Sequence, residues 1–188
     1  MFSPETRRIP GFFEPLQSWT KGNFGKLPGT AHKMTHSEGF LLLRRSLADP
    51  APPAVWPPGM EVAPIAASDA GRVHALLQRA YTNGFGKVPD NLLDWWEGLL
   101  TDSEFDRNLA LVARHGDDVV GFCLCWTSSF VKDLVVDAHW RNHGIGSALL
   151  STAIEALRAR HAEEVALKVD IYNATAQRLY RQFGFVQD

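Results

Sequence analysis

The stretch that decides the fold is Lys132-Asp133-Leu134-Val135-Val136-Asp137-Ala138-His139-Trp140-Arg141-Asn142-His143-Gly144-Ile145-Gly146-Ser147-Ala148-Leu149-Leu150. Its first residues are mostly apolar and β-branched, as a strand covered on both faces requires. Gly144 and Gly146 follow in a tight turn, where the missing Cβ atoms let backbone amides approach a ligand closely. The residues after the turn begin a helix, and the unpaired amides at a helix N-terminus attract phosphate groups. The stretch therefore predicts a buried strand, an anion-binding turn and a helix.

The spacing of Arg141, Gly144 and Gly146 narrows the choice of ligand. Arg141 adds a fixed cation just before the turn. A dinucleotide-binding turn reads G-x-G-x-x-G, and this chain has Leu149 where the third glycine belongs. Two glycines at such a turn also serve packing alone. The pattern R-x-x-G-x-G after an apolar strand resembles the pyrophosphate loop of the GNAT superfamily, the acetyl-CoA-dependent N-acetyltransferases.

A second motif lies at residues 173–185. The segment NATAQRLYRQFGF is similar to the closing N-x-x-A-x-x-L-Y-x-x-x-G-F pattern of the same superfamily. Asn173 follows an apolar strand, and Tyr180 lies two helical turns later on the same side of a helix. Taken singly, an asparagine here is a helix cap and a tyrosine here is a core residue. Together with the glycine turn, they make residues 60–188 similar to a GNAT domain.

Periodic patterns predict the elements around these motifs. Apolar runs and alternation predict strands at 60–66, 109–113, 119–126, 131–136 and 165–171. Helical spacing predicts helices through 73–80, 89–100, 146–160 and 173–183. The fold class is α/β with a mixed sheet, because the helix at 146–160 connects two strands that should be parallel. The resemblance implies the acyl-CoA N-acyltransferase (GNAT) fold, a central twisted mixed sheet with splayed parallel strands, flanked by helices.

Acetyl-CoA is the co-substrate that the resemblance implies, and it would lie where the two parallel strands diverge. Its pantetheine arm would pair with the backbone of the central strand, and its pyrophosphate would bind the amides of residues 142–147. Asn173 would bind the cofactor arm, and Tyr180 would lie near the thioester sulfur. The residues implied to bind acetyl-CoA are Val135, Val136, Arg141, Asn142, His143, Gly144, Ile145, Gly146, Ser147, Asn173 and Tyr180.

Acetyl transfer to an amine requires an acid and a base. An alkylamine of pKa about 10.4 is almost entirely protonated at neutral pH, so a base must take a proton, while Tyr180 can protonate the leaving thiolate of pKa about 8.5. Some members of the superfamily carry a Glu before an Asp on the central strand, and this chain has Lys132 there. Asp133 is therefore the first candidate base and His143 the second, although either could lie on a solvated face. No cysteine is positioned as a nucleophile, so we expect direct attack in a ternary complex.

Length, charge and cysteine content restrict the class of protein. The 188 residues suit one domain plus an extension, and a net charge of -2 argues against a nucleic-acid partner. Cys123 and Cys125 lie in an apolar run and are interpreted as core residues, and no zinc-binding spacing occurs, so no metal is expected. No apolar segment is long enough for a membrane span or a signal peptide, so we expect a cytoplasmic protein.

The amino-terminal part, residues 1–59, is richer in Pro and Gly than the rest of the chain. We interpret it as an arm and Pro-rich linker that precedes the domain at 60–188. A GNAT domain usually continues past its last helix into two more strands, and here there is room for one short strand. We therefore expect residues 38–45 to pair antiparallel with 165–171, either in the same chain or exchanged within a homodimer. The alternative is that the arm is the remnant of a lost first repeat and packs elsewhere.

The implied function is transfer of an acetyl group from acetyl-CoA to a primary amine of a small molecule or, less favoured, of a protein. Aromatic residues of the first two helices and their loops are candidates for the acceptor pocket, although aromatic residues at such spacing more often form core. These residues are Tyr81, Phe85, Trp95, Trp96 and Trp126. The alternative function is a non-catalytic acyl-CoA-binding module that senses the cofactor without turning it over.

Overall fold

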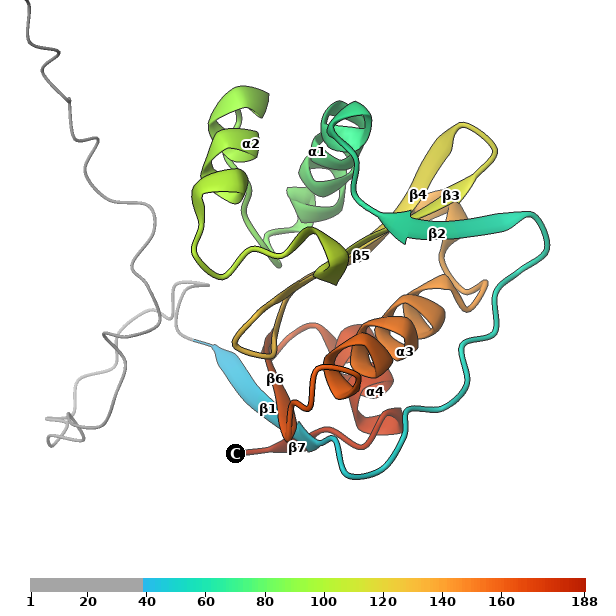
Figure 1. Ribbon diagram of the computed structural model, residues 1–188, viewed down its shortest axis with the longest axis vertical. Coiled ribbons are helices and arrows are strands. Elements are labelled where there is room, and N and C mark those ends of the chain that lie inside the picture. The colour runs from blue at the N-terminus through green and yellow to red at the C-terminus, as the bar shows by residue number, and fades with distance from the viewer. Residues whose placement is uncertain (1–38) are drawn as a thin grey trace, which may run out of the picture. The chain divides into compact units, whose positions relative to one another are not determined.

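Residues 39–188 are described by a computed structural model, in which seven strands form one sheet (Figure 1). The strands are β1 (Phe40–Ser46), β2 (Met60–Pro64), β3 (Ala110–His115), β4 (Asp118–Trp126), β5 (Phe130–Val136), β6 (Glu164–Asp170) and β7 (Val186–Gln187). Their order across the sheet is β2-β3-β4-β5-β6-β1-β7, and in this part of the chain only β5 and β6 run parallel. The mixed α/β fold predicted from the sequence is confirmed.

Two pairs of helices cover the two faces of the sheet (Figure 1). The helices are α1 (Ala70–Ala80), α2 (Leu92–Thr101), α3 (Ile145–Arg158) and α4 (Ala174–Gln182). The core under α1 and α2 contains buried Val73 and Phe122, and the core under α3 and α4 contains buried Leu149 and Leu167. Removing these apolar side chains from water is the main driving force for forming the two layers.

The strand β1 lies between β6 and β7, although it comes first along the described chain. All seven of its residues pair antiparallel with β6, and two of them also pair with β7. The pairing expected for residues 38–45 is thus present within one chain for Phe40–Ser46, while residues 1–38 lie outside the described part. The division of the chain at residues 59 and 60, and a homodimer, stay predictions.

The Pro-rich segment 47–59 between β1 and β2 is anchored on α3. The backbone amide of Ala51 donates to Glu155 Oε1 at 2.7 Å. Arg158 Nε donates to the carbonyl oxygen of Leu47 at 3.0 Å. These two bonds tie the segment to the helix that carries the glycine turn, and so they help to fix the position of that turn.

The parallel strands β5 and β6 diverge towards their carboxyl ends. They pair at Phe130 with Ala166 and at Val131 with Leu167, although β5 continues to Val136. Beyond these pairs, the β5 edge that faces β6 has no partner strand within residues 39–188. The splayed parallel strands expected from the resemblance are therefore present.

A β-bulge at Lys132 sets the direction of the side chains that follow it. The pairing with β4 skips one residue between Val131 and Asp133, so Lys132 is the extra residue of β5. In a regular strand Val131 and Val135 would share one face. Here Val131 packs in the core under α3 and α4, and Val135 packs in the core under α1 and α2. The bulge therefore turns Asp133 towards the α1 side of the sheet.

Candidate functional site

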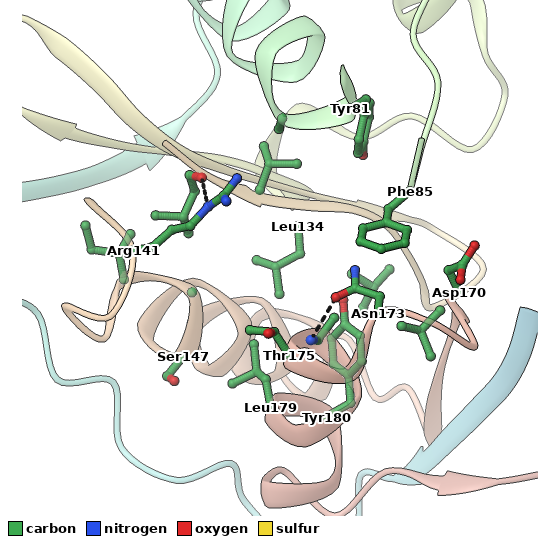
Figure 2. Close-up of a pocket in the computed structure, with 18 of the residues that line it drawn as sticks. Tyr81, Phe85, Leu134, Arg141, Ser147, Asp170, Asn173, Thr175, Leu179 and Tyr180 are labelled. Atoms are coloured by element: carbon green, nitrogen blue, oxygen red, sulfur yellow. Dashed lines mark hydrogen bonds between the residues drawn. The ribbon is translucent and has the colours of Figure 1, made fainter. Parts of the chain in front are cut away.

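A cavity of about 600 Å³ opens between the diverging ends of β5 and β6 (Figure 2). Its walls come from these strands, the turn before α3, the first turns of α3, the residues of α4 and the segment that ends α1. The predicted acetyl-CoA-binding residues in its lining are Val135, Val136, Arg141, Asn142, Gly144, Ile145, Gly146, Ser147, Asn173 and Tyr180. His143 and Asp133, also predicted for the site, are not part of the lining. The fold thus brings both sequence motifs to one cavity.

The N-terminus of α3 forms one end of this cavity. Its N-cap residue is Gly144, which has a φ of 84° and ψ of -4°, and no side chain caps the helix. The first helical hydrogen bond runs from the amide of Ala148 to the carbonyl oxygen of Gly144. The amides of Ile145, Gly146 and Ser147 therefore have no partner within the helix. This arrangement suits a phosphate group, because both the amides and the helix dipole favour negative charge.

The side chains of Arg141 and His143, which flank this end, differ in direction. Arg141 lies in the cavity lining, and its Nε donates a long 3.4 Å hydrogen bond to the carbonyl oxygen of Val136 (Figure 2). The ring of His143 instead contacts the carbonyl oxygen of Arg141 through Nδ1 at 2.8 Å. Within this structure His143 contributes backbone to the turn, and Arg141 contributes the cation.

Asn173, weighed from the sequence as a helix cap and as a cofactor contact, caps α4 and also lines the cavity. Its Oδ1 accepts a hydrogen bond from the amide of Ala176 at 3.1 Å, which makes it the N-cap of α4. Figure 2 shows the amide group of Asn173 beside the ring of Phe85 at the cavity. Capping uses the oxygen of the side chain, so the amide nitrogen is the part that faces a ligand in the cavity.

Tyr180 projects from α4 into the same cavity and is only 8% exposed. Its ring lies edge-on to the ring of Phe185, at 5.7 Å between centroids. Burial raises the pKa of the Tyr180 phenol, and the nearby Cys123 and Asp133 raise it further. The hydroxyl group therefore keeps its proton throughout the neutral range, as a general acid must before its proton is needed.

Asp133 accepts a hydrogen bond from a tyrosine, and the sequence did not indicate that these two residues would pair. The hydroxyl of Tyr81, which follows α1 in a short 3-10 turn (Tyr81–Asn83), donates to Asp133 Oδ1. Asp133 is 9% exposed, and Tyr81 rather than Asp133 lines the cavity. The two residues are 52 positions apart along the chain, and no spacing signal connects them.

The aromatic residues proposed for the acceptor pocket fall into two groups. Tyr81 and Phe85 line the cavity. The three tryptophans do not: Trp95 and Trp126 are buried in the core under α1 and α2, and Trp96 packs against it. The polar residues of the lining that the sequence did not single out for the pocket are Lys132, Lys168, Asp170 and Thr175.

Residues 39–188 contain no membrane-spanning helix, no cluster of metal-binding side chains and no disulfide. None of the helices there is both long and apolar enough to cross a membrane. The same residues hold no group of three or more His, Cys, Asp or Glu side chains that could bind a metal ion. Cys123 and Cys125 are both buried and form no disulfide, and they belong to the core under α3 and α4.

Comparisons with known proteins point to one family. The model of the acetyltransferase (GNAT) family matches residues 71–185, which include both motifs and the predicted cavity-lining residues. Human N-alpha-acetyltransferase 30 is 33% identical over 88 residues, covering 43% of this chain and 24% of that protein. Mycothiol acetyltransferase from Clavibacter michiganensis subsp. michiganensis is 29% identical over 189 residues, covering 91% of this chain and 58% of that protein.

A solved structure shows the same arrangement of elements. The GCN5-related N-acetyltransferase from Sphaerobacter thermophilus superposes with a TM-score of 0.68 at 26% identity, covering 79% of this chain and 48% of that chain. This chain therefore spans between about a quarter and just under 60% of the length of these three similar proteins.

Proposed function

We propose that this chain, which belongs to the acetyltransferase (GNAT) family, transfers the acetyl group of acetyl-CoA to a primary amine. One observation carries the proposal: no side chain among residues 39–188 caps the amides that begin α3, and the residues of these amides line a cavity between two diverging parallel strands. Such amides suit the diphosphate of CoA. The unpaired edge of β5 suits the amide groups of pantetheine, which would add to the sheet as an extended strand does.

Tyr180 and Asp133 would supply the acid and the base. The amine nitrogen attacks the thioester carbonyl carbon, so that a C–N bond forms and the C–S bond breaks. The thiolate takes the phenolic proton of Tyr180, and the proton lost by the amine nitrogen ends on Asp133. The raised pKa of Tyr180 is consistent with this role, because the phenol stays protonated until the thiolate develops. No covalent enzyme intermediate is needed.

We propose a small-molecule amine as the acceptor. Similarity to the relative named mycothiol acetyltransferase extends over 91% of this chain, whereas similarity to the human N-alpha-acetyltransferase extends over 43%. Tyr81 and Phe85 add apolar surface to the part of the cavity away from the α3 amides. A protein amine is the other acceptor class, and the N-alpha-acetyltransferase relative is the observation in its favour.

Calorimetry with CoA and a thiol-release assay with a panel of primary amines test this function. The wild-type protein should bind CoA and release CoA thiol with at least one amine. Tyr180→Phe should lower kcat about 10²- to 10³-fold while leaving CoA affinity unchanged, since only the acid is lost. Tyr172→Phe is the matched control, because Tyr172 is 59% exposed and lies outside the cavity lining. Well-folded protein that binds no CoA would contradict the proposal.

The same experiment separates the enzyme from a non-catalytic acyl-CoA sensor. The presence of Lys132 favours the sensor function, because some members of the family carry a Glu at that position, where a base is needed, and this chain does not. A wild-type protein that binds CoA but acetylates neither small-molecule amines nor peptide α-amines would support the sensor.

A further inference from the structure

The Asp133 carboxylate does not line the cavity, but it accepts a hydrogen bond from the hydroxyl of Tyr81, which does. We propose that Tyr81 is a further catalytic residue, through whose phenol oxygen the acceptor amine passes its proton to Asp133. This inference rests on the proposed acetyl transfer and adds the residue that the base requires.

Position is the first argument for this role. Tyr81 belongs to the cavity lining and Asp133 does not, although Asp133 accepts the hydrogen bond of the Tyr81 hydroxyl. Figure 2 shows Tyr81 and Tyr180 approaching the cavity from opposite sides. An amine that enters between them would therefore meet the phenol of Tyr81 before it could reach the carboxylate behind it.

The charge state of Tyr81 is the second argument. Burial raises the pKa of the Tyr81 phenol well above its usual value, and the charge and hydrogen bond of Asp133 raise it further. The titratable groups that face Tyr81 are Asp133 on β5, Tyr180 on α4 and Cys123 on β4. The ground state is thus a neutral phenol that donates to a carboxylate. A proton relay needs a neutral phenol, because Tyr81 can pass its own proton to Asp133 only as it accepts a proton from the amine.

The fit of the α1–α2 loop around Tyr81 is the third argument. A Cβ built on Gly86 would lie 2.3 Å from Tyr81 Cε1 and 2.6 Å from its Cζ, far inside van der Waals contact. A side chain at residue 86 could be accommodated only if the Tyr81 ring moved. The position of the ring beside Asp133 therefore requires that residue 86 has no side chain.

The proposed step balances as follows. The neutral amine attacks the thioester carbonyl carbon, and the C–N bond forms as the C–S bond breaks. A proton leaves the amine nitrogen for the phenol oxygen of Tyr81, while the original phenolic proton of Tyr81 moves to Asp133 Oδ1. The leaving thiolate takes the proton of Tyr180. After the amide and CoA leave, Asp133 loses its proton to solvent and Tyr180 regains one from solvent, which restores both groups.

The test compares Tyr81→Phe, Asp133→Asn and the double variant with the wild-type protein. Each single variant should lower kcat for amine acetylation about 10²-fold or more, with CoA affinity by calorimetry unchanged. The double variant should be no slower than the worse single variant, because residues that act as a unit are not additive. A solvent deuterium isotope effect on kcat should be smaller in Tyr81→Phe than in the wild type. If Tyr81 only anchored α1 and had no catalytic role, its substitution would change none of these quantities in protein that stays folded.

One further variant and two controls guard against a trivial loss of structure. Gly86→Ala keeps both reacting groups but displaces the Tyr81 ring, so it should lower kcat in the same direction. Gly71→Ala is its control, because a Cβ there meets only Leu92 Cδ2 at an ordinary 3.8 Å. Tyr172→Phe controls for the loss of a phenol outside the cavity.

The outcomes distinguish the relay from the underlying function. Active wild-type protein with a Tyr81→Phe variant that keeps kcat within about threefold would overturn the relay alone, since general-base catalysis contributes about 10²-fold or more. Strictly multiplicative losses in the double variant would also overturn it. Wild-type protein that binds CoA and acetylates nothing would overturn the proposed function and the relay with it.

Discussion

Val131 pairs with Leu167, and within the described residues this is the last pair that β5 and β6 make before they separate. Five positions further along β5, Val136 lies close to a glycine of α3. A Cβ built on Gly146 would lie 3.6 Å from Val136 Cγ2 and 3.8 Å from Leu179 Cδ2. The turn and the opening between the strands are therefore one structural unit, and substitutions in either should affect the same ligand.

Gly146→Ala should weaken CoA binding without harming the fold. The new Cβ would make only ordinary contacts in the ligand-free protein, and alanine favours a helix over glycine. In the complex, however, the methyl group would occupy space beside amides that must approach the diphosphate. We expect Kd for CoA to rise at least about tenfold, or ~1.4 kcal/mol, by calorimetry. Gly71→Ala, the second residue of α1 as Gly146 is of α3, is the matched control and should leave Kd unchanged.

Arg141→Ala should weaken CoA binding more modestly, and the effect should depend on salt. The guanidinium is exposed and makes a long 3.4 Å hydrogen bond to the carbonyl oxygen of Val136, so its attraction to a diphosphate is partly screened by water. We expect a loss of about fivefold at low ionic strength, or ~1 kcal/mol, which shrinks near 1 M salt. Arg178→Ala on the exposed side of α4 should change neither Kd nor its salt dependence. An effect of Arg141→Ala that is equal at all salt concentrations would argue against a charge contact.

Asp69→Ala should destabilise the protein at neutral pH and much less in acid. Burial acts to raise the pKa of Asp69, but hydrogen bonds from Arg114 and from the Ala66 amide outweigh it and hold the pKa below its usual range. Because the folded pKa is the lower one, this carboxylate stabilises the fold above the unfolded pKa of about 3.9, and the contribution is lost as pH falls through the folded value. At pH 7 we expect a loss of about 3 kcal/mol in the free energy of unfolding, because Arg114 would be left without its buried partner.

Urea unfolding at pH 7 and near pH 3 measures this difference directly. The gap between wild type and Asp69→Ala should narrow in acid. Glu97→Ala, on an exposed position of α2, should give only a small difference at pH 7. A gap for Asp69→Ala that is as wide near pH 3 as at pH 7 would exclude the ion pair with Arg114 as its cause.

Leu43→Ala should destabilise the domain as a core substitution does. Leu43 is 4% exposed and lies in the core under α3 and α4, although it belongs to the strand contributed by the amino-terminal arm. We expect a loss of about 3 kcal/mol in the free energy of unfolding, within the range for buried leucines. Leu42→Ala removes the same atoms from the adjacent, half-buried position and should cost less. Equal and small losses for both would mean that β1 is not an integral part of the sheet.

The sequence was most informative where a local pattern decides the structure. The apolar run at Val135 and the glycines after it predicted strand, turn and helix in order, because each depends on residues that are neighbours in sequence. The capping role weighed for Asn173 was also local. The helix expected at 89–100 begins three residues later, at Leu92, because the side chain of Asn91 accepts hydrogen bonds from the amides of Leu93 and Asp94. The apolar pattern does not predict that boundary, because it depends on one asparagine side chain.

The parts that the sequence did not reveal depend on distant residues or on backbone irregularity. Simple alternation places Val131 and Asp133 on one face, and only the bulge at Lys132 separates them. The bond between Tyr81 and Asp133 joins the turn after α1 to β5, so no local pattern could predict that the candidate base binds Tyr81 and does not line the cavity. His143 was a reasonable candidate by position, but its ring contacts the backbone of Arg141, a choice set by rotamer and turn geometry.

The position of β1 between β6 and β7 affects the order in which the elements of the chain fold. During synthesis, β1 leaves the ribosome more than a hundred residues before β6 and β7, the strands that flank it. Its apolar residues therefore stay unpaired while the other elements form. Contacts between such distant segments close late and slowly. We expect nascent chains to depend on chaperones at this stage, and the last step of folding to be the insertion of β1 into the gap between β6 and β7.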